Sequence, residues 1–103
     1  MIARIWRTGL DESRAAEYDA FAAERSLPMF RRHPGFRAVF FVRTANGRAT
    51  ITVWRDLAAA EALAESADYL QTVEAILATG FLMPPQSVEL LPVDYAWLAP
   101  DLI

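Results

Sequence analysis

The alternation of polar and apolar residues is clearest in the segment 48–55. Two threonines and a tryptophan alternate there with two β-branched apolar residues, in the order Thr50, Ile51, Thr52, Val53 and Trp54. This period of two is typical of a β-strand whose two faces meet different surroundings. We therefore predict a strand with one apolar face and one mixed face.

A helix is predicted directly after this strand, over 57–66. Asp56 stands at a position suited to an N-cap, because its carboxylate can accept hydrogen bonds from free N–H groups of the first turn. Apolar residues then recur at helical spacing, namely Leu57, Ala60, Leu63 and Ala64. We expect this stripe to fold back over Ile51 and Val53, which leaves the face that carries Trp54 uncovered by this unit.

Three more strands are predicted, over 1–8, 36–43 and 86–95. In the first, Arg4 and Trp6 fall on one face. In the last, Pro92 indicates an edge strand or a bulge, since proline cannot donate to a sheet ladder.

A hairpin is predicted between the second and third strands. Asn46 and Gly47 favour a type I′ turn, because both residues accept positive φ. Side chains directly opposite each other share a face. The register that follows places Arg43 opposite Thr50, Phe41 opposite Thr52 and Val39 opposite Trp54.

Two further helical segments complete the pattern. The first covers 11–26, and Pro28 is expected to end or kink it. The second covers 69–79 and has Ser66 or Asp68 as its N-cap.

The predicted order is βαββαβ with the second helix broken in two. This is the split βαβ pattern of an α+β, ferredoxin-like fold, a four-stranded antiparallel sheet with helices on one face. Two helical layers cannot cover both faces of such a sheet. The tail 96–103 is apolar and too short to fold alone, so we expect it to pack on a partner subunit.

Composition narrows the class of protein. A chain of 103 residues suits one domain, 1–103, and 54% hydrophobic residues predict a packed core. The net charge of −3 argues against nucleic-acid binding. The chain has no cysteine and no apolar run long enough to cross a membrane. Its N-terminus lacks the apolar core of a signal peptide, and we expect a cytoplasmic location.

Two motifs carry a resemblance to a known family. W-R-D-L-x-x-x-E-A-L-A-E-S at 54–66 and P-G-F at 34–36, together with the element order, resemble the antibiotic biosynthesis monooxygenase family of dimeric α/β barrels. The resemblance implies a homodimer whose two sheets close into a barrel. It also implies a small-molecule cavity between each sheet and its own helices or at the barrel rim. Some members oxygenate aromatic polyketides without metal or organic cofactor, and others degrade haem.

The haem-degrading branch implies three residues that this chain does not have. These are an Asn on the first strand, a Trp on the following helix and a haem-ligating His. The first strand here has no Asn, the two helix positions are Leu63 and Val73, and the single histidine, His33, precedes the second strand. We therefore expect no cofactor and no tight binding of haem. Scattered carboxylates and one histidine give no metal-ligand spacing.

The candidate ligand-binding residues lie on the mixed face of the predicted sheet: Arg4, Trp6, Phe41, Arg43, Thr52 and Trp54, beside Thr50. Aromatic faces would hold a flat ligand, and an arginine would favour its anionic form. The alternative is that these residues fill a dimer interface, with Arg4 paired to Glu89 or Asp94. Tyr18, Tyr69 and Tyr95 are candidates for hydrogen bonds to a ligand. His33 is either a general base or a surface residue.

The function predicted from these residues and the resemblance is a cofactor-independent monooxygenase-like reaction on a small aromatic or polyketide-like compound. In such a reaction the substrate supplies the electrons, and Arg4 or Arg43 would stabilise its anion. The sequence shows no clear general base. The alternative is a non-catalytic small-molecule-binding or structural homodimer of the same fold. A buried polar group without a protein partner would favour the first hypothesis.

Overall fold

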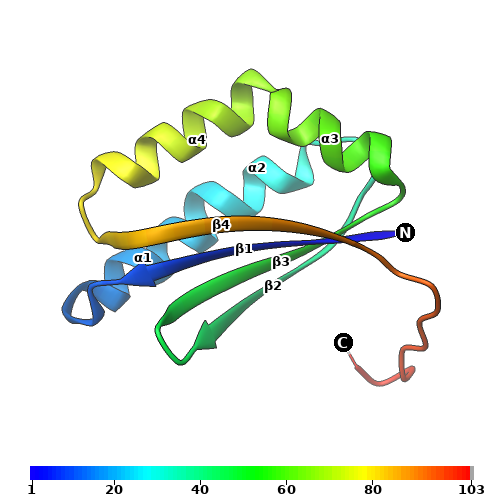
Figure 1. Cartoon of the computed structure of the whole chain (residues 1–103), viewed down its shortest axis with the longest axis horizontal. Helices are drawn as coiled ribbons and strands as arrows, with labels where there is room; N and C mark the ends of the chain where they lie inside the picture. Colours follow the sequence, from blue (N-terminus) through cyan, green and yellow to red (C-terminus); the bar gives the residue numbers. More distant parts are fainter. Residues whose placement is uncertain (103) are drawn as a thin grey trace.

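The computed structural model describes residues 1–102. Its four strands are β1 (Ile2–Leu10), β2 (Phe36–Thr44), β3 (Gly47–Trp54) and β4 (Leu82–Pro92). They form one antiparallel sheet in the order β2-β3-β1-β4, with the helices on one side (Figure 1). The predicted ferredoxin-like βαββαβ fold is confirmed, and Pro92 does lie on an edge strand.

The first helical segment continues past Pro28, so of the two predicted effects of this proline the end of the helix is wrong. It consists of a 3-10 turn (Glu12–Arg14), α1 (Ala15–Phe21), a π-helical turn (Ala22–Ser26) and α2 (Leu27–Arg31). Pro28 does not end the segment, because it lies in the first turn of α2, where a backbone N–H has no partner within the helix. The π-helical turn directly before α2 interrupts the regular helical ladder at the point where proline enters it.

The second helical segment is broken in two, as predicted, but the break is the single residue Ser66 and the second part begins at Ala67 rather than at 69. It consists of α3 (Leu57–Glu65) and α4 (Ala67–Ala78). The Asp56 carboxylate accepts a hydrogen bond from the backbone N–H of Ala59 at 2.9 Å, so it caps α3. The hydroxyl of Ser66 accepts from the N–H of Tyr69 at 3.1 Å and caps α4. Both predicted caps are confirmed.

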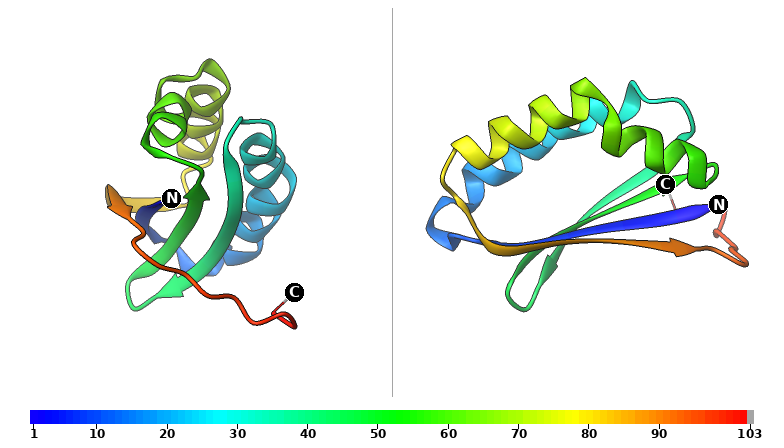
Figure 2. Two further views of the ribbon diagram at one scale, coloured as in Figure 1. Left: turned by 90° about the vertical axis from the view of Figure 1, so that its right-hand side faces the viewer. Right: turned by 45° about the horizontal axis from the view of Figure 1, so that its top comes forward.

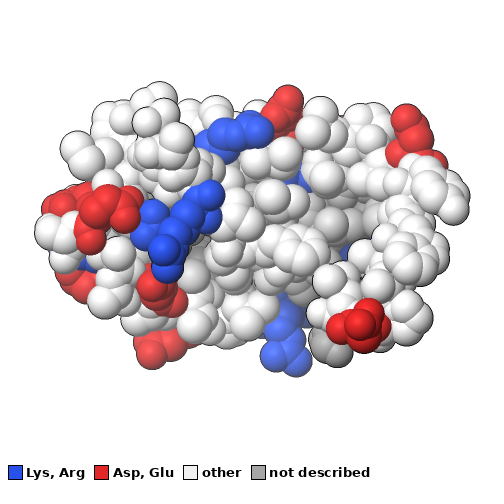
Figure 3. All heavy atoms as spheres, turned by 90° about the horizontal axis from the view of Figure 1, so that it is seen from below, with Lys and Arg blue, Asp and Glu red and all other residues white. Residues whose placement is uncertain are grey.

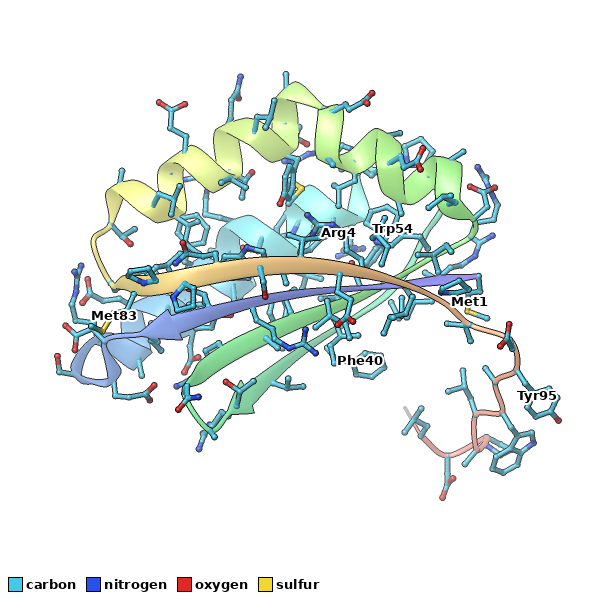
Figure 4. The ribbon with its side chains drawn as sticks, in the orientation of Figure 1. Met1, Arg4, Phe40, Trp54, Met83 and Tyr95 are labelled. Atoms are coloured by element: carbon cyan, nitrogen blue, oxygen red, sulfur yellow. The ribbon has the colours of Figure 1, made fainter. Side chains whose placement is uncertain are left out.

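The predicted assignment of sheet faces is wrong. Trp54 and Thr52 are both 0% exposed and lie beneath the helices, whereas Ile51 and Val53 point to the other side. Figure 4 shows Trp54 and Arg4 between the sheet and the helices, and Phe40 beyond the sheet. The core around Trp54 consists of Ile2, Met29, Phe30, Trp54, Ala59, Ala60 and Leu63. The apolar pattern predicted which residues share a face, but not which face this chain's own helices cover.

Within residues 1–102 no helix covers the other face of the sheet, and of the tail Ala96 and Leu98 border one end of it, beside Phe40. Its apolar side chains, placed by the strand registers, are Ala3, Ile5, Ala38, Phe40, Val42, Ala49, Ile51, Val53 and Leu91. We call this set the uncovered face. Figure 3 views it from below and shows it largely uncharged across its middle. Arg7 and Glu89 form an exposed ion pair on the same side, with 2.9 Å between Nη1 and Oε1.

The hairpin has a different turn from the predicted one. Thr44 pairs with Gly47, so the turn is Ala45–Asn46, and within 1–102 no residue other than glycine has positive φ. Gly47 is itself not in the positive-φ region. A side chain there would collide with the backbone of Thr8, so close approach to β1 is what requires glycine. The observed register places Arg43 opposite Arg48, Phe41 opposite Thr50 and Val39 opposite Thr52.

A bulge in β2 and the ranges of β1 and β4 also differ from the prediction. A bulge between Phe36 and Ala38 turns Phe36 to the Trp54 side, where the two ring centroids are 5.6 Å apart. β1 continues to Leu10 rather than ending at Thr8, and β4 covers 82–92 rather than 86–95.

The tail leaves the sheet after β4 and extends away from the helices (Figure 2). Tyr95 and Trp97 on it are 86% and 73% exposed. The last residue of the predicted tail, 103, lies outside the described residues. Within 1–102, no helix combines the length and the apolar character needed to cross a bilayer.

Candidate functional site

Arg4 is the residue around which the candidate site is arranged. β1 directs its side chain toward the helices, and it is only 4% exposed (Figure 4). Its Nη2 donates a hydrogen bond to the hydroxyl of Tyr69 on α4 at 2.7 Å. The guanidinium carbon also lies 5.0 Å from the centroid of the Tyr69 ring. Among residues 1–102, no carboxylate forms an ion pair with Arg4.

The second buried arginine differs from Arg4, because it has a carboxylate partner. Arg48 is 7% exposed, and its two terminal nitrogens reach the two carboxylate oxygens of Glu12 at 3.0 and 3.1 Å. Removing a cation from water costs several kcal/mol unless a partner compensates it. The protein supplies a carboxylate to Arg48 and only a phenol to Arg4. The charge of Arg4 is therefore available to an anion from outside the chain.

A small cavity lies beside Arg4, between the sheet and the helices. Its volume is about 40 Å³. Its lining residues are Arg4, Trp6, Tyr18, Ser26, Met29, Phe30, Thr50, Tyr69, Thr72, Val73 and Ile76. We call this space the inner cavity. It has room for a molecule little larger than water.

A larger groove borders Arg4 on another side. Its volume is about 440 Å³, within the range of small-molecule sites. Its lining residues are Arg4, Ala60, Glu61, Ala64, Glu65, Tyr69, Val88 and Leu90. We call this space the outer groove. Arg4 and Tyr69 line both spaces, so the pair stands between them.

The polar groups of the inner cavity are mainly hydroxyls. Burial raises the pKa of the Tyr18 phenol, and the Thr50 hydroxyl and the Arg48 charge act in the opposite direction. Tyr18 is therefore a protonated phenol at neutral pH and a hydrogen-bond donor. The Thr72 hydroxyl donates to the carbonyl oxygen of Asp68 at 2.9 Å.

The buried polar groups do not provide the unpaired group that would have favoured the oxygenase hypothesis. Within 1–102, every fully buried side-chain nitrogen and oxygen has a hydrogen-bond partner. Arg4 itself is 4% exposed, donates to Tyr69 and lines both the inner cavity and the outer groove.

The predicted site residues are divided among three places. Arg4 and Trp6 line the inner cavity together with Thr50. Thr52 and Trp54 are buried in the core, where the indole Nε1 of Trp54 donates to the Thr52 hydroxyl at 2.8 Å. Phe41 and Arg43 are exposed on edge strand β2 and line neither space. Their roles in ligand binding remain predictions.

The sequence analysis missed the helical wall of the inner cavity. That wall consists of Ser26, Met29, Phe30, Thr72, Val73 and Ile76. A signal was present at Thr72, a polar residue on the otherwise apolar stripe of α4. Of the three tyrosines, Tyr18 and Tyr69 line the inner cavity, and Tyr95 lies on the exposed tail.

His33 and Glu89 lie away from both spaces. The His33 Nε2 is 3.6 Å from a carboxylate oxygen of Asp68, and His33 lines neither the inner cavity nor the outer groove. Glu89 pairs with Arg7 on the side of the uncovered face. In residues 1–102, no three His, Asp or Glu side chains are grouped to hold a metal ion.

The comparisons with known proteins agree with this architecture. A scan against protein-family models gives no match, and a search of the curated proteins gives none either. Solved structures do match over most of the chain. The fold is the ferredoxin-like fold of antibiotic biosynthesis monooxygenase structures, from which dimeric α/β barrels are built.

Three of these structures show the range of the likeness. A variant of SnoaB, a cofactor-independent oxygenase from Streptomyces nogalater, has a TM-score of 0.75 at 21% identity and covers 92% of this chain and 94% of that one. A putative antibiotic biosynthesis monooxygenase from Nitrosomonas europaea has a TM-score of 0.72 at 15% identity, and the match covers 92% of this chain and 100% of that one. A protein of unknown function from the same organism has a TM-score of 0.73 at 19% identity, and the match covers 95% of this chain and 93% of that one. At these identities the likeness establishes the fold alone.

Proposed function

We propose that this protein is a cofactor-independent monooxygenase-like homodimer that acts on a small aromatic or polyketide-like compound. The observation that carries the proposal is the Arg4 guanidinium, buried without a carboxylate and bordering two spaces. A phenolate or enolate oxygen on Arg4 would compensate that charge. Arg4 has this role rather than Arg43, because Arg43 is exposed and lines neither space.

The proposed reaction balances without a cofactor. A methylene between two aromatic rings loses two hydrogens and becomes a ketone. One atom of dioxygen enters the product and the other leaves as water, with all electrons supplied by the substrate. Arg4 and the Tyr69 hydroxyl would stabilise the substrate anion that forms when the first proton leaves. The mostly apolar walls of the inner cavity suit dioxygen beside that anion.

The homodimer in this proposal forms through the uncovered face. Phe40 is 46% exposed there, and its neighbours on the same face are apolar. Contiguous apolar surface of this kind is rarely left in water. Two-fold pairing of identical faces is the commonest solution, and the exposed tail would extend onto the partner. We expect this assembly in the cytoplasm, as one domain over 1–103.

One observation favours a non-catalytic binding protein as the second candidate. The titratable side chains that line the inner cavity are Arg4, Tyr18 and Tyr69. None of these is an ordinary base at neutral pH, and the carboxylates that line the outer groove, Glu61 and Glu65, are exposed on its wall. A binding protein needs the Arg4 anchor but no base.

Oxygen uptake with anthrone distinguishes the two candidates. Anthrone has an acidic methylene between two aromatic rings, and its oxidation to anthraquinone consumes one dioxygen and releases one water. We expect uptake by the wild type, above the enzyme-free rate, without added metal or flavin. Arg4→Ala should lower the rate constant by roughly 10- to 150-fold, the equivalent of a charged hydrogen bond. Arg31→Ala is the control, because Arg31 is exposed on α2.

Three outcomes of this assay are separable. Uptake that depends on Arg4 supports the oxygenase. No uptake, with anthrone binding that depends on Arg4, supports the binding protein. Equal behaviour of Arg4→Ala and wild type would overturn the role of Arg4 in both.

A further inference from the structure

We infer that the outer groove binds the body of the ligand, and that Glu61 and Glu65 on its wall select against a second negative charge. The inference rests on the proposed role of Arg4 as anchor and goes on to name the class of ligand. That class is a flat molecule with one anionic oxygen and a distal end that is neutral or cationic.

The sizes of the two spaces decide where the body of the ligand lies. The inner cavity, at about 40 Å³, has no room for an aromatic ring system. The outer groove, at about 440 Å³, does. Because Arg4 borders both, a ligand in the outer groove can place its anionic oxygen on the guanidinium while its rings stay outside the inner cavity.

The walls of the outer groove suit a flat apolar body. Leu90 and Val88 stand on β4 opposite Arg4 and Trp6, so they share the face that carries the guanidinium. Both are partly exposed, and therefore have surface left for a ligand to cover. On the helical side, Ala60 and Ala64 are small, which leaves space between α3 and β4.

Glu61 and Glu65 give the groove its charge selectivity. They are four residues apart on α3, which places them on one side of the helix, and both line the groove. Both are exposed, and neither forms an ion pair among residues 1–102. Their charges are thus not neutralised within the described chain. A second anionic group on the ligand would meet them, whereas a cationic group would be attracted.

A matched set of naphthalene-2-carboxylates tests this inference. All three probes carry one carboxylate for Arg4, and at position 6 they carry a carboxylate, a carboxamide or an aminomethyl group. Dissociation constants are measured by calorimetry at low salt with the full-length protein. We expect the aminomethyl probe to bind most tightly and the dicarboxylate to bind about tenfold or more weakly, with the difference shrinking as salt is added.

The variants separate the anchor from the selectivity. Glu61→Gln with Glu65→Gln should compress the spread among the three probes to about twofold while it leaves the carboxamide affinity unchanged. Glu74 is exposed on α4 and does not line the groove, so Glu74→Gln should leave the differences in affinity among the three probes as in the wild type. Arg4→Ala should weaken all three probes together.

Each contrary result has a defined meaning. Equal wild-type affinities for the three probes overturn the charge selectivity and leave the Arg4 anchor standing if Arg4→Ala still weakens binding. A spread that survives the double glutamate variant overturns the role of Glu61 and Glu65. Failure of all three probes to bind the wild type at millimolar concentration overturns the groove as a ligand site. Oxygen uptake with anthrone then decides the proposed function separately.

Discussion

At the scale of single residues, this chain treats its buried polar groups in two ways. Most are paired within the protein, as Arg48 is with Glu12 and Trp54 is with Thr52. Arg4 is the exception among the buried arginines, since its partner is a neutral phenol. Paired groups fix the structure around them, and a cation with a neutral partner is the kind of group that recruits a ligand.

Trp54 separates a structural role from a binding role. It is fully buried, it contacts Phe36 and it lines neither space. Trp54→Ala should therefore lower the free energy of unfolding by roughly 3–5 kcal/mol, because it removes a large core side chain and leaves a cavity. Thr52→Val should cost about 1–3 kcal/mol, since it leaves the buried indole N–H without an acceptor.

Chemical denaturation at constant protein concentration measures both values, with Leu77→Ala on α4 as the control at an exposed apolar residue. A Trp54→Ala variant that keeps wild-type stability but loses ligand affinity would show that Trp54 acts in ligand binding rather than in the core.

At the scale of elements, the strand-to-helix junction at Asp56 controls where α3 begins. The Asp56 carboxylate accepts from the N–H of Ala59 and from the side chain of Arg55. These hydrogen bonds, the one from Ala59 first, hold its pKa below the ordinary value. Because α3 carries Ala60, Glu61 and Glu65, the same cap positions one wall of the outer groove.

The lowered pKa of Asp56 predicts a pH dependence of stability. A carboxyl group with a depressed pKa in the folded state contributes stability above its unfolded pKa and loses it as pH falls through the folded pKa. Asp56→Asn keeps an N-cap without a titrating group. We therefore expect wild type to be more stable than Asp56→Asn at pH 7, and the two melting temperatures to converge below about pH 4.

Thermal melts of both proteins between pH 7 and pH 3 measure this convergence. A difference in melting temperature that stays constant over the whole range would show that the charge of Asp56 does not stabilise the cap.

At the scale of the whole molecule, the two faces of the sheet have different surroundings. One face, with its helices, encloses the core and the inner cavity. The uncovered face is largely apolar and no helix of residues 1–102 lies on it, and Figure 3 shows few charged side chains across its middle. Burial of apolar surface contributes about 25 cal/mol per Å², so pairing two such faces favours association before entropy costs.

A charge on the uncovered face should therefore dissociate the proposed dimer. Phe40 and Leu77 are similarly exposed, at 46% and 52%, but they lie on the uncovered face and on α4 respectively. We expect Phe40→Glu to give a monomer at micromolar concentration by light scattering, and Leu77→Glu to keep the dimer. A wild type that is monomeric at that concentration would contradict the homodimer itself.

Much of the architecture could be predicted from local pattern. The period of two at Thr50–Trp54, the caps at Asp56 and Ser66 and the order βαββαβ all depend on neighbours in the chain, and all are confirmed. The hairpin register was wrong, because Gly47 is required by the approach of β1 rather than by the turn. The first helix continued past Pro28, since a π-helical turn precedes it.

The sequence by itself determined which side chains share a face and that Arg4 and Trp6 lie together. Only the tertiary structure decided which face the helices cover, because both faces carry large apolar residues and periodicity does not distinguish burial by the chain's own helices from burial by a partner. Tertiary packing also places Trp54 in the core, Tyr69 against Arg4 and Glu12 against Arg48. Whether a buried charge has a partner depends on residues more than thirty positions away, which no local pattern specifies.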